Sequence, residues 1–175
     1  MSIDHQKILP LLVLTASITA CGPNAVNLQP APDATNPACA KAMVAMPKTL
    51  SGLDQRETTA QATTAWGEPT AIVLKCGVEL PTDPVSDPCQ SVNGVDWIVK
   101  PTDKEQAQSS EQTATGTWYA ETFGREPAIQ VTFEADRVSS STVLAELASA
   151  VEQLPQKKQC TNVEDTLTDV QGGVG

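Results

Sequence analysis

Cysteines are the residues of this 175-residue sequence most able to do chemistry. Four of the five, Cys39, Cys76, Cys89 and Cys160, are spread over the region that follows an apolar N-terminal segment. An even number of isolated cysteines behind an export leader is typical of disulfides, and four cysteines allow three pairings. The single histidine, His5, precedes all of them, so a zinc site would need four isolated thiolates. We therefore expect two disulfides, no metal site and no cofactor.

The fifth cysteine, Cys21, ends the apolar N-terminal segment. That segment, residues 8–20, is shorter than the roughly twenty apolar residues of a spanning helix and matches a signal-peptide core. Residues 18–21 read ITAC, an apolar residue, two small residues and a cysteine, which resembles the bacterial lipobox. In a lipobox the thiol receives a diacylglyceryl group, and a peptidase then cleaves before the cysteine. We expect residues 1–20 to be a lipoprotein signal peptide and Cys21 to be the lipid attachment site.

Two acyl chains anchor a protein stably, because each buried CH₂ group contributes ~0.8 kcal/mol. The expected location is therefore the extracytoplasmic face of a cell membrane, with the lipid bilayer as the first partner. The net charge is −10, and only Lys157 and Lys158 form a basic pair. Binding of nucleic acid, or of anionic headgroups by charge alone, is not expected of such a chain.

Catalysis by a Ser-His or Cys-His pair is excluded once His5 leaves with the signal peptide. A carboxylate pair or a Ser-Lys dyad remains possible, and the candidate carboxylates are Asp83, Asp87, Asp96, Glu121 and Glu126. Asp83 and Asp87 each precede a proline, a turn pattern, and Asp96 is expected on the solvated side of a strand. A carboxylate-dependent hydrolase acting on cell-wall glycan is thus the alternative to a non-catalytic protein.

Two residues are candidates for a ligand surface. Trp66 stands in a Trp-Gly segment before a proline and is expected in a loop rather than a strand. Arg125 follows Gly124 at an expected turn and could bind a carboxylate or phosphate in bidentate fashion. A core position for Trp66 and an intramolecular salt bridge for Arg125 remain open. The partners expected beyond the bilayer are another envelope protein or a glycan.

Hydrophobic spacing predicts a short helix after residue 38 and a closing amphipathic helix over residues 139–155. Four strands are predicted between them, at residues 71–76, 92–100, 116–124 and 127–135. The fold class is therefore α+β, a two-layer domain with a mostly antiparallel four-stranded sheet, two helices and disulfide staples. No internal repeat is expected.

The domain organisation follows from composition. Residues 21–38 hold the lipidated cysteine and a Pro-rich stretch that we expect to be a tether. Residues 39–160 form the single globular domain, with a polar, mobile loop at 101–114, and residues 161–175 are expected to be a flexible tail.

The order of these elements favours one disulfide pairing. Cys76 ends a strand and Cys89 begins the next, so a hairpin would join them, while Cys39 and Cys160 would tie the domain's ends. The pairing of Cys39 with Cys76 and of Cys89 with Cys160 is the alternative.

The segments AWGEPTAIVLKCGVELP, VNGVDWIV and WYAETFGREPAIQV, with the closing helix, resemble an actinobacterial family of predicted lipoproteins, the domain-of-unknown-function family thirty-five fifteen. The resemblance runs from about Cys39 to Cys160, and the four cysteines fall where the family carries them. It implies an envelope location and a lipid anchor but no activity. We therefore expect a membrane-anchored, exported bacterial lipoprotein that acts as a non-catalytic binding or assembly module of the cell envelope.

Overall fold

A computed structural model of the protein describes residues 24–79, 89–102 and 115–160. The expected signal peptide, Cys21, the expected flexible tail and all but the first two residues of the expected polar loop lie outside the described residues.

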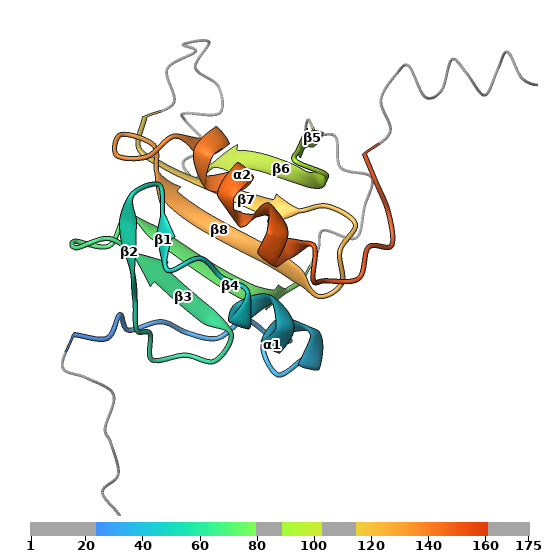
Figure 1. Ribbon diagram of the computed structural model, residues 1–175, viewed down its shortest axis with the longest axis horizontal. Helices are drawn as coiled ribbons and strands as arrows, with labels where there is room; N and C mark the ends of the chain where they lie inside the picture. Colours follow the sequence, from blue (N-terminus) through green and yellow to red (C-terminus); the bar gives the residue numbers. More distant parts are fainter. Residues whose placement is uncertain (1–23, 80–88, 103–114, 161–175) are drawn as a thin grey trace, which may run out of the picture.

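The described chain forms two helices and one antiparallel sheet of eight strands (Figure 1). The helices are α1 (Pro37–Val44) and α2 (Ser140–Val151). The strands are β1 (Thr49–Leu50), β2 (Leu53–Arg56), β3 (Thr63–Trp66), β4 (Ile72–Val78), β5 (Cys89–Val92), β6 (Val95–Pro101), β7 (Thr117–Thr122) and β8 (Ala128–Glu134). Two helices on an antiparallel sheet confirm the coarse prediction, but a sheet of four strands is wrong.

The sheet consists of two four-stranded meanders, β1–β4 and β5–β8, which meet at the central pair of β4 and β8. The strand order is β1-β2-β3-β4-β8-β7-β6-β5, so the first strand of each half lies at an edge and the fourth at the centre. The register of β4 and β8 is symmetric about the pair of Leu74 and Val131. The matching pairs on either side are Ile72 with Phe133 and Cys76 with Ile129. The strand order of one half therefore mirrors that of the other about the central pair.

The two meanders also have similar short sequences at equivalent turns. Residues 49–54 (TLSGLD) form the β1–β2 hairpin and residues 91–96 (SVNGVD) form the β5–β6 hairpin, each with two positive-φ residues at its turn. Residues 66–72 (WGEPTAI) and 123–129 (FGREPAI) span the β3–β4 and β7–β8 turns. These matches are too short to predict a repeat from the sequence, and they become visible only when the strand order aligns the two halves.

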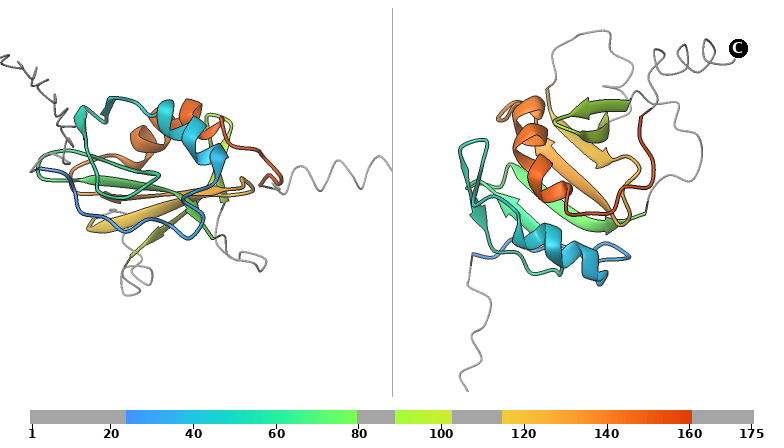
Figure 2. Two further views of the ribbon diagram at one scale, coloured as in Figure 1. Left: turned by 90° about the horizontal axis from the view of Figure 1, so that it is seen from below. Right: turned by 45° about the vertical axis from the view of Figure 1, so that its right-hand side comes forward.

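Both helices lie on one face of the sheet, and the core fills the space between the two layers (Figure 2). Helix α1 starts at Pro37 because the Asn36 side chain accepts a hydrogen bond from the Ala38 amide at 3.0 Å. Helix α2 buries the apolar stripe that its sequence predicts. The largest fully buried side chains are Trp66, Trp97, Phe133, Leu50, Ile72, Leu74, Ile98, Ile129, Leu147, Leu154, Val95 and Val131.

Strands β1, β2 and β3 were not predicted, because their sequence is polar and lacks an apolar alternation. Side-chain hydrogen bonds add to the packing of Leu50 and Trp66 in this region. Gln55 Nε2 donates to Thr64 Oγ1 at 2.9 Å, and the Thr63 hydroxyl donates to Ala60 O at 2.7 Å. Strand β5 is a short, polar edge strand and carries no periodic signal either.

Residues 24–36, expected to be a tether, are part of the fold, and we call them the N-terminal strap. Val26 forms a parallel bridge with Thr58, and the Asp33 amide donates to Gly77 O at 2.9 Å. The contact requires a glycine, since a Cβ at Gly77 would lie 2.6 Å from the Ala34 nitrogen. The predicted tether is therefore wrong for these residues. The prolines prevent a regular helix or strand there. The other residues of the strap still form backbone hydrogen bonds with the sheet and bury Ala31 and Ala34.

Residues 155–160, the C-terminal strap, bind the β7–β8 turn in a similar way. Gly124 O accepts hydrogen bonds from the amides of Lys157 and Lys158 at 2.6 and 3.1 Å. The Glu126 amide donates to Pro155 O at 3.1 Å. The N-terminal strap thus binds the half of the sheet formed by β1–β4, and the C-terminal strap binds the half formed by β5–β8.

The disulfides join Cys39 to Cys76 and Cys89 to Cys160, with Cα atoms 5.7 and 5.9 Å apart. The favoured pairing of Cys76 with Cys89 and of Cys39 with Cys160 is wrong, and the alternative pairing is found. The reason is topological. Strand β4 pairs with β3 and β8, while β5 lies at the far edge of the sheet, so no hairpin joins the two strands.

Candidate functional site

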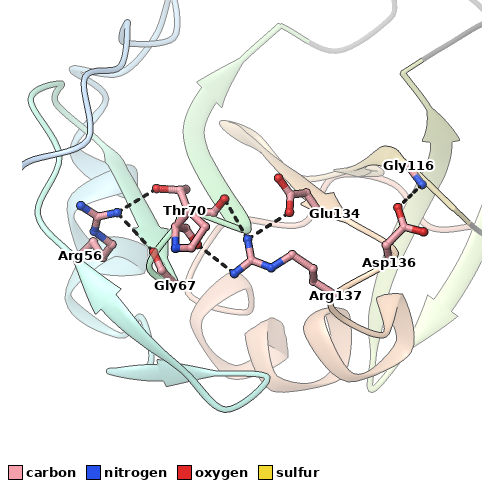
Figure 3. Close-up of polar contacts among 8 residues, drawn as sticks. Arg56, Gly67, Thr70, Gly116, Glu134, Asp136 and Arg137 are labelled. Carbon is pink, nitrogen blue, oxygen red and sulfur yellow. Dashed lines mark hydrogen bonds and ion pairs between the residues drawn. The ribbon is translucent and has the colours of Figure 1, made fainter.

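Two arginines hold the β3–β4 turn through its backbone (Figure 3). Arg56 Nη1 donates to Gly67 O at 3.3 Å and to Thr70 Oγ1 at 3.1 Å. Arg137 donates to Thr70 O at 3.3 Å and to Pro69 O at 2.9 Å. A guanidinium group presents several N–H groups in a fixed plane, so one side chain can bind two acceptors of a tight turn.

Carboxylates neutralise both guanidinium groups. Arg56 forms an ion pair with Glu68 at 2.9 Å, and Arg137 forms one with Glu134 at 3.0 Å. Glu68 is 78% exposed, and ion pairs in water contribute only about 0–1 kcal/mol. Nearby, Asp136 accepts a hydrogen bond from the Gly116 amide at 2.7 Å. Arg56 and Arg137, with their paired carboxylates, therefore position the backbone of the β3–β4 turn and do not form a group of unpaired charges.

Arg56 also fixes the start of the described chain. Its Nη2 donates to Asn24 O at 2.8 Å, three residues after Cys21. The strap then pairs with the end of β2 and the following loop, where the Val26 amide donates to Glu57 O at 2.8 Å and the Thr59 amide donates to Val26 O at 3.0 Å. Residues 24–26 are thus held against the sheet.

Neither candidate for a ligand surface is at the surface. Trp66 is the last residue of β3 and is fully buried, with its indole N–H donating to Pro47 O at 3.0 Å. Arg125 is 5% exposed, and its Nη1 donates to Leu154 O at 2.7 Å. The prediction of a ligand surface at these residues is therefore wrong. The Trp66 ring packs in the hydrophobic core. The Arg125 guanidinium group binds the carbonyl of Leu154, the residue before the C-terminal strap.

The three candidate carboxylates within the described residues have different surroundings. Asp96, expected on a solvated face, is 7% exposed, because the C-terminal strap covers it and the Cys160 amide donates to its Oδ2 at 2.8 Å. Glu121 accepts a hydrogen bond from Gln130 Nε2 at 2.7 Å on β7, and Glu126 is exposed in the β7–β8 turn. The remaining two candidates, Asp83 and Asp87, lie outside the described residues.

Within the described ranges, no three His, Cys, Asp or Glu side chains are arranged to hold a metal ion. None of the helices seen there is both long and apolar enough to cross a membrane.

Comparison with known families gives one result. The model of the family described as "Protein of unknown function (DUF3515)" matches residues 7–159. The chain belongs to this family. The match begins at Lys7 and includes the Cys39–Cys76 disulfide and Cys89, and it ends one residue before Cys160, so the expected membership is confirmed over nearly the whole chain. Neither a curated protein nor a solved structure matches the chain.

The residues that organise this end of the molecule, Arg56 and Arg137, were not singled out from the sequence. One signal was present, because the sequence contains only three arginines. All three donate to backbone carbonyls in the structure, two at the β3–β4 turn and Arg125 before the C-terminal strap. Their role depends on which turn they reach, and that follows from the sheet order.

Proposed function

We propose that the protein is a membrane-anchored, exported bacterial lipoprotein that serves as a non-catalytic binding or assembly module of the cell envelope. The observation that carries the proposal is Cys21, which stands where the apolar leader stops and follows the small residues Thr19 and Ala20. A diacylglyceryl group on this thiol, together with a further acyl chain, gives a stable anchor.

Two structural features support this proposal. The four remaining cysteines pair as two disulfides, which persist in oxidising compartments outside the cytoplasm. The described fold begins at Asn24, directly behind the proposed anchor, with its backbone bound by Arg56. An exported domain attached at Cys21 would therefore be held close to the membrane, where envelope proteins and glycans are available as partners.

The deciding experiment is the intact mass of the native protein purified from membranes, before and after reduction and alkylation. We expect the mass of the chain from Cys21 plus acyl groups, with four thiols alkylated only after reduction. Cys21→Ser should remain unprocessed or leave the membrane fraction. Thr19→Ala is the matched control, since it keeps a small residue at the same site and should be processed normally.

An unprocessed native chain without acyl groups, or a Cys21→Ser variant that stays acylated, would show that the proposal is wrong.

A further inference from the structure

The N-terminal strap and the loop between β2 and β3 form one continuous surface. We call it the anchor surface and define it as residues 24–30 and 58–62. Val26 bridges Thr58, the Leu28 amide donates to Thr59 Oγ1 at 3.1 Å, and Thr59 Oγ1 donates to Asn27 Oδ1 at 3.1 Å. Backbone and side-chain bonds thus hold the two segments side by side along one edge of the molecule (Figure 1).

The anchor surface is uncharged in a strongly acidic protein. Neither of its segments contains Asp, Glu, Lys or Arg, although 18% of the residues in the chain are charged and the net charge is −10. The charged residues that border it are the exposed Glu57 and the ion pair of Arg56 with Glu68. Its exposed residues are Asn24, Asn27, Gln29, Pro30, Thr59 and Gln61. The surface therefore presents amides and a hydroxyl, which form hydrogen bonds without carrying a charge.

The anchor surface lies within a short covalent reach of Cys21. A chain spans at most about 3.3–3.6 Å per residue, so the three steps from Cys21 to Asn24 cover only ~10 Å. Arg56 binds the carbonyl of Asn24, and the Glu57 carbonyl binds the Val26 amide, so the strap is not free to extend this reach. A lipid on Cys21 would hold this edge at the membrane–water interface.

We propose that the anchor surface lies directly on the phospholipid headgroups, an inference that rests on the proposed lipidation of Cys21. Anionic lipids give the bilayer a negative surface potential that repels acidic residues. Uncharged amides and hydroxyls escape this repulsion and can bind phosphate and glycerol oxygens. The sheet order places β5 at the opposite edge, and Figure 2 shows the β5–β6 hairpin on the far side from the strap. The β5 edge therefore faces away from the bilayer and towards any partner.

The test uses the native acylated protein in vesicles of equal parts phosphatidylcholine and phosphatidylglycerol. An environment-sensitive fluorescent amino acid is introduced by codon suppression at one of two exposed glutamines, Gln61 in the β2–β3 loop of the anchor surface or Gln90 on the edge strand β5. This label leaves the cysteines unchanged. A nitroxide on the lipid headgroup should quench the fluorophore at Gln61 several-fold more than the fluorophore at Gln90.

A matched variant carries twelve flexible Gly and Ser residues between Pro23 and Asn24. Such an insertion has a root-mean-square reach of about 17–21 Å, so the preferential quenching at Gln61 should fall towards the value at Gln90. Equal quenching at both positions in the native protein, or a difference that the insertion leaves unchanged, would overturn the inference. Co-sedimentation with vesicles is measured first. A chain that does not sediment would overturn the proposed lipid anchor itself, so the two failures are distinguishable.

Discussion

Trp66 and Trp97 are both fully buried, yet they differ in how their indole N–H groups are satisfied. The Trp66 N–H donates to Pro47 O, whereas that of Trp97 has no partner among the described residues. A buried polar group without a partner costs free energy, so the two tryptophans should respond differently to loss of the N–H. Burial of Trp66 thus contributes a specific bond as well as apolar packing.

Trp66→Phe should lower the free energy of unfolding more than Trp97→Phe, by about 1–3 kcal/mol, because it leaves Pro47 O without its donor. Both substitutions remove a similar volume from the core, so each is the control for the other. Urea-induced unfolding followed by circular dichroism measures the difference. Equal losses, or a larger loss for Trp97→Phe, would contradict the role given to the Trp66 N–H.

At the scale of elements, each disulfide joins segments that the sheet alone leaves separate. One attaches α1 to the central strand β4, and the other attaches the C-terminal strap to the edge strand β5. The two cysteine pairs are 37 and 71 residues apart in the sequence. By the loop-entropy model each bridge contributes about 4 kcal/mol, and the difference in loop length adds little.

Replacing Cys76 with Ser should free the thiol of Cys39, and replacing Cys89 with Ser should free that of Cys160. Alkylation without reduction, followed by peptide mass mapping, locates the free thiol in each variant. A free thiol at Cys89 in the Cys76→Ser protein would instead support a hairpin disulfide and contradict the observed topology.

At the scale of the whole molecule, two four-stranded meanders share one core. The central pair of β4 and β8 joins them, and helix α2 contacts the first hairpin turn of each half. The Ser51 amide donates to Glu146 Oε2 at 2.7 Å, and Asn93 Nδ2 donates to Ala145 O at 3.4 Å. Because α2 belongs to the second half and covers both, the first half lacks part of its core when separated.

Residues 24–79 expressed alone should therefore not fold, although they contain a complete four-stranded meander and one disulfide. The free edge of β4 and the uncovered apolar face would leave too little buried surface to offset the loss of conformational entropy. Amide dispersion in NMR spectra tests this, with residues 24–160 as the folded control. A dispersed spectrum for the fragment would show that each half is an autonomous unit.

Helix α2 and strands β4, β6, β7 and β8 could be predicted from the sequence, because their apolar spacing reports directly on burial. Strands β2 and β3 could not, because their polar side chains form hydrogen bonds that only the folded chain creates, from Gln55 to Thr64 and from Thr63 to the Ala60 carbonyl. For the candidate site too, some features could be predicted from the sequence and others depended on tertiary contacts. Cysteine count and membership of the family were determined by residue identity, whereas exposure of Trp66 and Arg125 was not.

The sequence alone thus determined residue chemistry: four cysteines after an apolar N-terminal segment that ends at Cys21, an acidic net charge and two amphipathic helices. Tertiary structure decided which cysteines pair, which proline-rich residues pack, and which arginines bind which turn. The physical reason is that these contacts join residues distant in the chain. They depend on β4 pairing with β8 across the centre of the sheet, and no local pattern encodes that pairing.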